Sequence, residues 1–164
     1  MKPIKRLPDH VVNQIAAGEV IERPANALKE LLENSIDAGA DIIRIELMLG
    51  GTKLIKVVDN GCGISKEDLP LALERHATSK ITSFNDIEHL ASLGFRGEGL
   101  ASMASISRCK LISKTSSATY AYSISSLNGQ LSDVSVASHP DGTTVEINDI
   151  YFNVPARKKF MKSA

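Results

Sequence analysis

Residues 23–39 read RPANALKELLENSIDAG and carry the clearest helix signals in the chain. Pro24 suits the first turn of a helix, because its missing N–H is not needed there, and Gly39 suits the C-terminal cap. Four apolar residues between them recur at helical spacing: Leu28, Leu31, Leu32 and Ile36. The stretch therefore predicts an amphipathic helix from Arg23 to Gly39 with one apolar stripe.

Extended segments follow this helix and also close the chain. Residues 41–49 alternate apolar and polar side chains, residues 53–58 are again extended, and Gly50-Gly51 separates the two, which predicts an antiparallel hairpin. Four further strands are predicted at residues 109–113, 120–127, 131–137 and 143–150. Asn128-Gly129 fits a primed turn between the middle two.

Shorter helices are expected between the hairpin and the later strands, at residues 65–75, 86–93 and 100–106. Because helices come early and hairpin-linked strands come late, the order predicts an α+β fold. We expect one domain over residues 1–164. It would be a two-layer α/β sandwich whose mixed, mostly antiparallel sheet carries helices on one face.

The composition excludes several classes of protein. Nineteen Lys and Arg residues balance nineteen Asp and Glu residues, so the net charge indicates neither a nucleic-acid nor a membrane surface. Cys62 and Cys109 lie far apart, and the histidines lack metal-ligand spacing. No run of about 18 apolar residues is present. We expect a soluble, intracellular protein that continues beyond the uncapped helix signal at residues 155–164.

The polar face of the first helix is a candidate for chemistry. Four residues share it, at spacings of three, four and seven: Glu30, Glu33, Asn34 and Asp37. A solvated polar face is the simpler interpretation when the spacing is taken alone. Asn34 favours function, because its amide oxygen can bind a hard cation one turn from Glu30, a carboxylate able to take a proton from water.

The segment Asp59-Asn60-Gly61-Cys62-Gly63 follows a predicted strand and precedes Ser65. It fits an ordinary strand-to-helix turn, since Asp, Asn and Gly are common turn residues. It also fits a base site, where the carboxylate accepts a hydrogen bond from an exocyclic amine. Gly61 and Gly63 would then let a flat base approach the backbone.

Phosphate-binding glycines must come from another part of the chain, because neither the P-loop signature nor a dinucleotide-binding signature is present. Residues 94–100, GFRGEGL, place three glycines before a helix start, where unpaired N–H groups favour an anion. A flexible surface loop is the weaker alternative, because Phe95 and Leu100 flank the glycines. Thr78, Ser79 and Lys80 suit a movable flap over phosphates, and a plain loop fits them equally well.

Several segments in this order resemble one family, the ATPase domains of the MutL DNA mismatch repair proteins, within the superfamily of gyrase B, Hsp90 chaperones and histidine kinases. Seven segments carry the resemblance: residues 29–40, 59–64, 94–100 and 141–145, and the more particular QIAAGEVI at 14–21, RHATSKI at 75–81 and FNVPAR at 152–157. They extend over nearly the whole chain. The family usually has alanine where Gly99 stands here.

The resemblance implies a Bergerat-type ATP-binding fold and assigns roles to single residues. Glu30 would be the general base, Asn34 would bind Mg²⁺, and Asp59 would bind the adenine amine, with Thr143 beside it through a water. Gly61 and Gly63 would line the adenine. The remaining residues would hold or cover the phosphates: Thr78, Ser79, Lys80, Gly94, Phe95, Arg96, Gly97, Gly99 and Leu100.

The resemblance also implies partners and a slow ATP-driven clamp. Two copies of the full-length protein would form a homodimer through the lid and the N-terminal arm, residues 1–20, in response to nucleotide. The mismatch-recognition protein MutS would be a partner, and DNA would contact mainly other regions of the protein. The family's phosphate-sensing lysine lies in a later domain, so we expect slow hydrolysis by this chain alone.

Two rival interpretations of the sequence exist. The first is a non-catalytic interaction module that binds nucleotide only as a stabilising ligand. The second is another enzyme of the superfamily, a histidine kinase or a topoisomerase subunit. Residues 14–21 and 152–157 argue against the second rival, because neither enzyme has a recognisable counterpart to them.

Overall fold

The computed structural model describes Ile4 and residues 21–74 and 99–154. In these ranges the elements follow in this order: α2 (Pro24–Asp37), β1 (Ile43–Met48), η1 (Leu49–Gly51), β2 (Leu54–Asp59), α3 (Leu69–Ala72), α5 (Gly99–Ser105), β3 (Arg108–Lys114), β4 (Ala121–Leu127), β5 (Gln130–Leu131), β6 (Ser135–Ala137) and β7 (Gly142–Asn148). The predicted hairpin, the helix expected at residues 100–106 and the turn at Asn128-Gly129 are confirmed. Asn128 and Gly129 both have positive φ.

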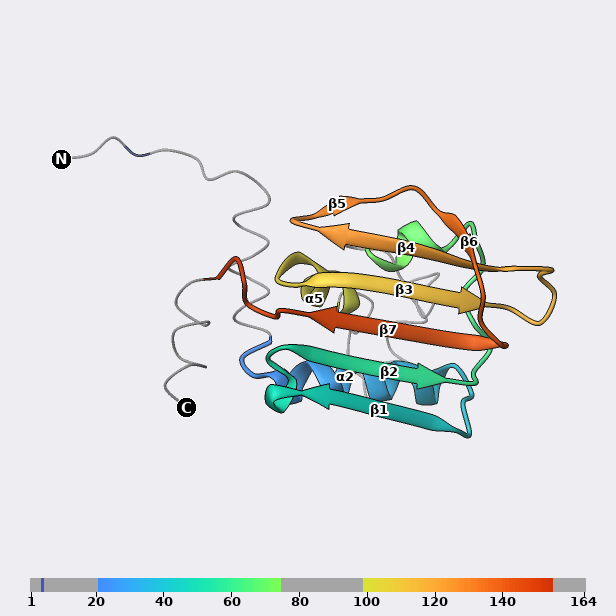
Figure 1. The fold of residues 1–164 in the computed structure, drawn as a ribbon, viewed down its shortest axis with the longest axis horizontal. Coiled ribbons are helices and arrows are strands. Elements are labelled where there is room, and N and C mark those ends of the chain that lie inside the picture. The colour runs from blue at the N-terminus through green and yellow to red at the C-terminus, as the bar shows by residue number, and fades with distance from the viewer. Residues whose placement is uncertain (1–3, 5–20, 75–98, 155–164) are drawn as a thin grey trace, which may run out of the picture.

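The described strands form one seven-stranded sheet in the order β1-β2-β7-β3-β4-β5, with β6 also paired to β4. Each pairing among them is antiparallel. Helices α2 and α5 lie on the same face of this sheet, as Figure 1 shows. The predicted α+β architecture, a mostly antiparallel sheet with helices on one face, is confirmed.

The core lies between the sheet and these helices. Alternate residues of the central strands are buried toward the helices: Ile55, Val57, Cys109, Leu111, Val145 and Ile147. Helices α2 and α5 contribute Ala27, Leu31 and Met103. On the opposite face, four charged residues of alternating sign are register partners across β1, β2, β7 and β3: Glu46, Lys56, Glu146 and Lys110. This alternation of burial, with a period of two, is typical of an antiparallel sheet with one buried face.

The apolar stripe of α2 differs from its prediction at one position. Ala27, Leu31 and Ser35 are buried, whereas Ile36 is 64% exposed. The side chain of Ser35 turns toward the sheet because its hydroxyl donates a hydrogen bond to Asp59. Ile36, the next residue, is rotated by about 100° around the helix and therefore points away from the core.

The predicted strand at residues 131–137 is broken into two short strands. Leu131 pairs with Ser126 and Ser135 pairs with Ser123, so the chain between them holds one extra residue, which is a β-bulge. The hydroxyl of Ser132 accepts a hydrogen bond from the Ser125 N–H at 2.9 Å. The Ser132 side chain thus accepts the hydrogen bond that a backbone carbonyl accepts in a regular ladder, so regular strand pairing stops here.

Other predicted elements are shorter or lie outside the described residues. The helix expected at residues 65–75 is only α3, Leu69–Ala72. The helices expected at 86–93 and 155–164 and the N-terminal arm fall outside the described ranges. Within those ranges, no helix is both long and apolar enough to cross a membrane.

Candidate functional site

Asp59 at the end of β2 is a buried carboxylate held by three hydrogen-bond donors. It is 9% exposed and is the register partner of Thr143 at the start of β7. Its Oδ1 accepts hydrogen bonds from the N–H groups of Gly61 at 2.9 Å and Thr143 at 3.2 Å. Its Oδ2 accepts one from the hydroxyl of Ser35 at 2.7 Å. The carboxylate therefore has a fixed orientation.

The loop after Asp59 packs between the end of α2 and the end of β3. A Cβ at Gly61 would lie 2.8 Å from Cβ of Ala38, and the N–H of Cys62 donates to the Ala38 carbonyl at 2.9 Å. At Gly63, where φ is +77°, a Cβ would collide with the Lys114 carbonyl. Both positions require glycine for close packing of this loop, whether or not a base also approaches it.

Glu30 and Asn34 lie one turn apart on α2, and both are half-buried. Gly99 at the start of α5 lies so close to Glu30 that a Cβ there would be 2.9 Å from Oε2. Leu100, the next residue of α5, is buried in the core. The polar face of α2 therefore packs partly against α5 and is not a fully solvated face at these positions.

A second set of hydrogen bonds extends the site to Ser113 in β3. Asp59, Thr143, Ser113 and Tyr122 are register partners in one row across four strands. The Ser113 Oγ lies 2.8 Å from Thr143 Oγ1, and it accepts a hydrogen bond from the Ile64 N–H at 2.7 Å. Ser113 thus ties the loop after Gly63 to the start of β7.

Ser35 and Ser113 are site residues that the sequence analysis missed. Each hydrogen-bonds to a residue predicted for the site, Asp59 or Thr143. These partners are 24 and 30 positions away in sequence. No local signal marks either serine, because serine is common both in helices next to turns and in half-buried strands.

Seven of the predicted site residues lie outside the described ranges: Thr78, Ser79, Lys80, Gly94, Phe95, Arg96 and Gly97. The described part of the site therefore consists of Glu30, Asn34, Asp59, Leu100, Thr143 and the glycines at 61, 63 and 99. Among the described residues, no group of three or more His, Cys, Asp and Glu could hold a metal ion. A cation here would need ligands besides protein carboxylates, such as the Asn34 amide and phosphate oxygens.

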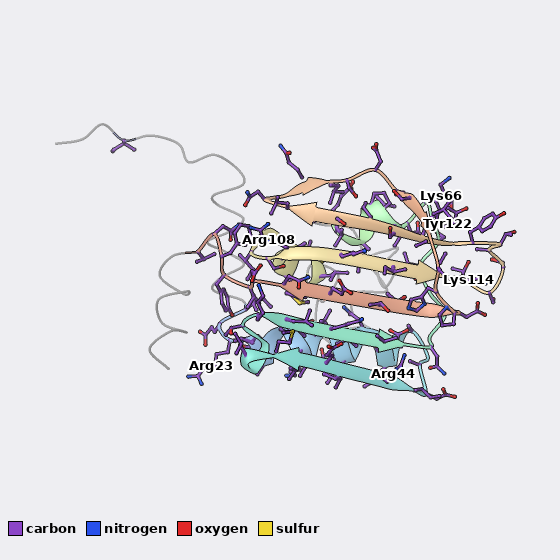
Figure 2. All side chains as sticks on the ribbon, viewed as in Figure 1. Arg23, Arg44, Lys66, Arg108, Lys114 and Tyr122 are labelled. Atoms are coloured by element: carbon purple, nitrogen blue, oxygen red, sulfur yellow. The ribbon has the colours of Figure 1, made fainter. Side chains whose placement is uncertain are left out.

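Two lysines lie at the same end of the sheet as Asp59 and Thr143. Figure 2 shows Lys66 next to Tyr122, with Lys114 nearby. The Lys66 Nζ lies 5.2 Å from the centroid of the Tyr122 ring, and the Lys114 Nζ forms an ion pair with Asp141 at 2.7 Å. Both cations are engaged within the protein, so neither is assigned to an anion.

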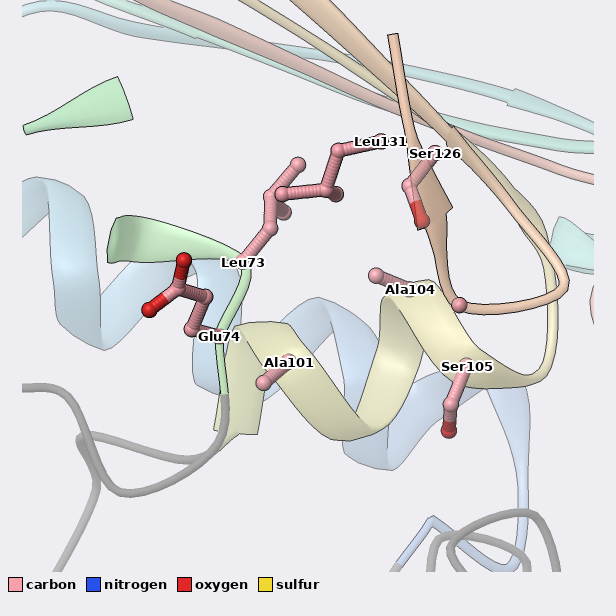
Figure 3. A pocket seen from close by; sticks show the side chains of 8 residues that line it. Leu73, Glu74, Ala101, Ala104, Ser105, Ser126 and Leu131 are labelled. Atoms are coloured by element: carbon pink, nitrogen blue, oxygen red, sulfur yellow. The ribbon is translucent and has the colours of Figure 1, made fainter. Parts of the chain in front are cut away.

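A cavity of about 240 Å³ lies apart from these residues, between α5, the end of α3 and the β4–β5 turn (Figure 3). It is lined by Leu73, Glu74, Ala101, Ala104, Ser105, Ser126, Gly129 and Leu131. The only ionisable group in this lining is the carboxylate of Glu74. This lining includes none of the predicted site residues, so this cavity is not the candidate site.

The two cysteines occupy different environments. Cys62 is exposed in the loop between the two glycines, whereas Cys109 is buried in the core. Burial raises the pKa of the Cys109 thiol from 9.0 to about 12, and the negative charge of Glu146 adds to this shift. Cys109 is therefore an inert core residue at neutral pH.

Comparisons with known proteins found several that are similar to this chain. Residues 21–153 match the family described as histidine kinase-, DNA gyrase B-, and HSP90-like ATPase. The chain is 60% identical over 99% of its length to the DNA mismatch repair protein MutL of Neisseria meningitidis serogroup B, and 56% identical over 98% to that of Salmonella arizonae. It covers 25% and 26% of those proteins, or about a quarter of their length.

Solved structures are similar as well. The N-terminal domain of a DNA repair protein superposes with a TM-score of 0.78 at 34% identity, over 96% of this chain and 46% of that one. The MutL ATPase domain of Aquifex aeolicus complexed with ADP superposes with a TM-score of 0.64 at 33% identity, over 86% of this chain and 48% of that one. At 34% and 33% identity, these proteins are similar to this chain in sequence as well as in fold.

Proposed function

Because this chain belongs to the family of histidine kinase-, DNA gyrase B- and HSP90-like ATPases, we propose that it binds ATP with Mg²⁺ and hydrolyses it slowly. The longer protein that contains it would use this reaction in DNA mismatch repair, as the names of its relatives suggest. The observation that carries the proposal is the buried Asp59 carboxylate, held by Ser35, Gly61 and Thr143.

Asp59 binds the adenine in this proposal. An ionised carboxylate only accepts hydrogen bonds, and the exocyclic amine of adenine only donates them. The amine hydrogen-bonds to Oδ2, which receives one protein donor, whereas Oδ1 receives two. A carboxylate that is already oriented binds this amine without reorganisation, which favours affinity. Gly61 and Gly63 line the base on the side of the loop.

Glu30 is the general base in this proposal. It accepts a proton from the water that attacks the terminal phosphate, and it lies against the start of α5. Asn34, one turn away, would hold Mg²⁺ through its amide oxygen. Bound there, Mg²⁺ would supply positive charge that stabilises the phosphate oxygens.

The phosphates are held by residues 94–99, with Leu100 anchoring the start of α5 in the core. Lys80 supplies a cation, and Thr78 and Ser79 supply hydroxyls in a lid. These assignments come from the family resemblance. Gly99, the last residue of the segment, lies directly against Glu30, which supports placing the terminal phosphate near that carboxylate.

The longer protein acts as a nucleotide-dependent clamp in the cytoplasm. ATP orders the lid and the N-terminal arm, two copies associate through them, and hydrolysis releases the pair. MutS is its proposed partner, and DNA contacts lie mainly outside this domain, whose net charge is zero. Light scattering of the full-length protein with and without ATP tests the clamp; a mass that does not change with nucleotide contradicts it.

Single-turnover hydrolysis tests the catalytic function. Glu30→Gln keeps the size of the side chain but removes the base, so we expect turnover to fall about a hundredfold or more while ATP affinity stays within a few-fold. Glu67→Gln, which neutralises an exposed carboxylate in the turn before α3, is the control and retains turnover. Equal turnover in the wild type and Glu30→Gln would favour the non-catalytic module.

A further inference from the structure

Ser113 has no assigned role, although it lies in the same row as the residues of the proposed base site. We infer that Ser113 is a positioning residue that fixes the hydrogen-bond polarity of Thr143 and so contributes to selection of a 6-amino over a 6-oxo purine. The inference rests on the proposed nucleotide site. It goes beyond that site by naming a residue that touches no nucleotide.

The hydroxyl of Ser113 has three polar neighbours. It is 1% exposed, so water does not compete for its hydrogen bonds. The Ile64 N–H lies at 2.7 Å, the Gly142 carbonyl oxygen at 3.0 Å, and Thr143 Oγ1 at 2.8 Å. The first of these can only donate, the second can only accept, and the third can do either.

The chemistry of a hydroxyl decides the direction of the third contact. A serine hydroxyl offers one hydrogen and two lone pairs. Its one hydrogen goes to the Gly142 carbonyl, and one lone pair takes the Ile64 N–H. All three contacts are hydrogen bonds only if Thr143 donates its hydroxyl hydrogen to the second lone pair of Ser113. Thr143 then presents only lone pairs to a ligand.

At Thr143 the base site therefore presents only hydrogen-bond acceptors to a ligand. Thr143 stands next to Asp59, whose ionised carboxylate is also acceptor-only. The 6-amino group of adenine donates to such a pair, whereas the 6-oxo group of hypoxanthine would place oxygen against oxygen. A bridging water would have to donate one hydrogen to Thr143, and it could donate its other hydrogen to ring N1 of adenine.

Calorimetric titration of the complete chain with ATP and with inosine triphosphate, both with Mg²⁺, tests the inference. In Ser113→Ala the Thr143 hydroxyl is free to turn its hydrogen toward the ligand. We expect the ratio of the inosine triphosphate Kd to the ATP Kd to fall about tenfold, the usual worth of one hydrogen bond. Ser113→Thr keeps the hydroxyl and should restore the ratio of the wild type.

The ratio of the two Kd values separates this positioning role of Ser113 from a merely structural one. Ser113→Ala also removes the acceptor of the Ile64 N–H, which would weaken both nucleotides alike and leave their ratio unchanged. An unchanged ratio therefore overturns the inference. If Ser113→Ala does not fold, Ser113→Cys must show the same fall, because a thiol is a weak acceptor of similar volume. Binding of neither nucleotide to the wild type would overturn the proposed function as well.

Discussion

The carboxylate of Glu30 lies against the backbone of Gly99, so closely that a Cβ at position 99 would be 2.9 Å from Oε2. The two residues belong to different helices, α2 and α5, and are 69 positions apart in sequence, from 30 to 99. The start of α5 therefore limits where the proposed general base can stand. This contact joins Glu30 to the last glycine of residues 94–100, the segment predicted from the sequence to bind phosphates.

Side chains of increasing size at position 99 should impair turnover step by step. In Gly99→Ala the flexible end of Glu30 gives way by a few tenths of an ångström, so turnover should stay within a few-fold. In Gly99→Val the displacement approaches 1 Å, and we expect turnover to fall about a hundredfold. Single-turnover kinetics with a parallel ATP titration measures both effects.

A double variant shows whether the effect passes through Glu30. If Gly99→Val acts by displacing that carboxylate, it should add little to Glu30→Gln, because the base is already absent. Full additivity of the two losses would mean that position 99 acts on the phosphates directly and not through Glu30.

Gly142 is expected to be indispensable for the fold. Its φ is +131°, and a Cβ there would collide with the carbonyl of Asp59, where β7 meets β2. Gly142→Ala should lower the free energy of unfolding by about 3 kcal/mol and abolish ATP binding. Gly129→Ala, at a φ of +78° with open space around it, should cost only about 1 kcal/mol. Urea denaturation compares the two, and equal losses would contradict this account of Gly142.

The buried thiol of Cys109 should make stability fall at alkaline pH. The raised pKa, about 12, keeps the thiol neutral in the fold, while in the unfolded chain it ionises near 9.0. Above pH 9 unfolding therefore releases a proton, and this contribution to stability is lost as the pH rises. Between pH 8 and pH 10 we expect it to cost about 1.4 kcal/mol.

Urea titrations of the wild type and of Cys109→Ala at both pH values isolate this contribution. The variant is less stable throughout, but its free energy of unfolding should change by about 1.4 kcal/mol less between the two pH values. Cys62→Ala, which removes an exposed thiol, should keep the dependence of the wild type. The same dependence in Cys109→Ala would show that the buried thiol does not cause it.

Much of the fold follows from local signals in the sequence. Helix α2 begins at Pro24 and ends before Gly39, and the β1–β2 hairpin and the turn at Asn128-Gly129 appear where alternation and turn residues predict them. The break at Ser132 does not follow from such signals, because a hydroxyl there replaces a carbonyl of the regular ladder. That exchange depends on the neighbouring strand, which no local pattern describes.

The candidate site was predicted only in part, because local sequence patterns do not describe contacts between distant segments. Asp59 and Thr143 were singled out by motif and resemblance, and the register of β2 and β7 places them side by side. Ser35 and Ser113 were not found, because their contacts join residues far apart in sequence. The roles of Thr78, Ser79, Lys80 and residues 94–97 stay predictions, since these residues lie outside the described ranges.

The most direct test of the central claim is a calorimetric titration of the chain with ATP and Mg²⁺, repeated with Asp59→Asn after thermal unfolding has shown that the variant is folded. The claim is that the Asp59 carboxylate, oriented by its three donors, binds the amine of adenine. We expect the wild type to bind ATP and the variant to bind it about tenfold to a hundredfold more weakly. Equal affinities would contradict the placement of adenine at Asp59.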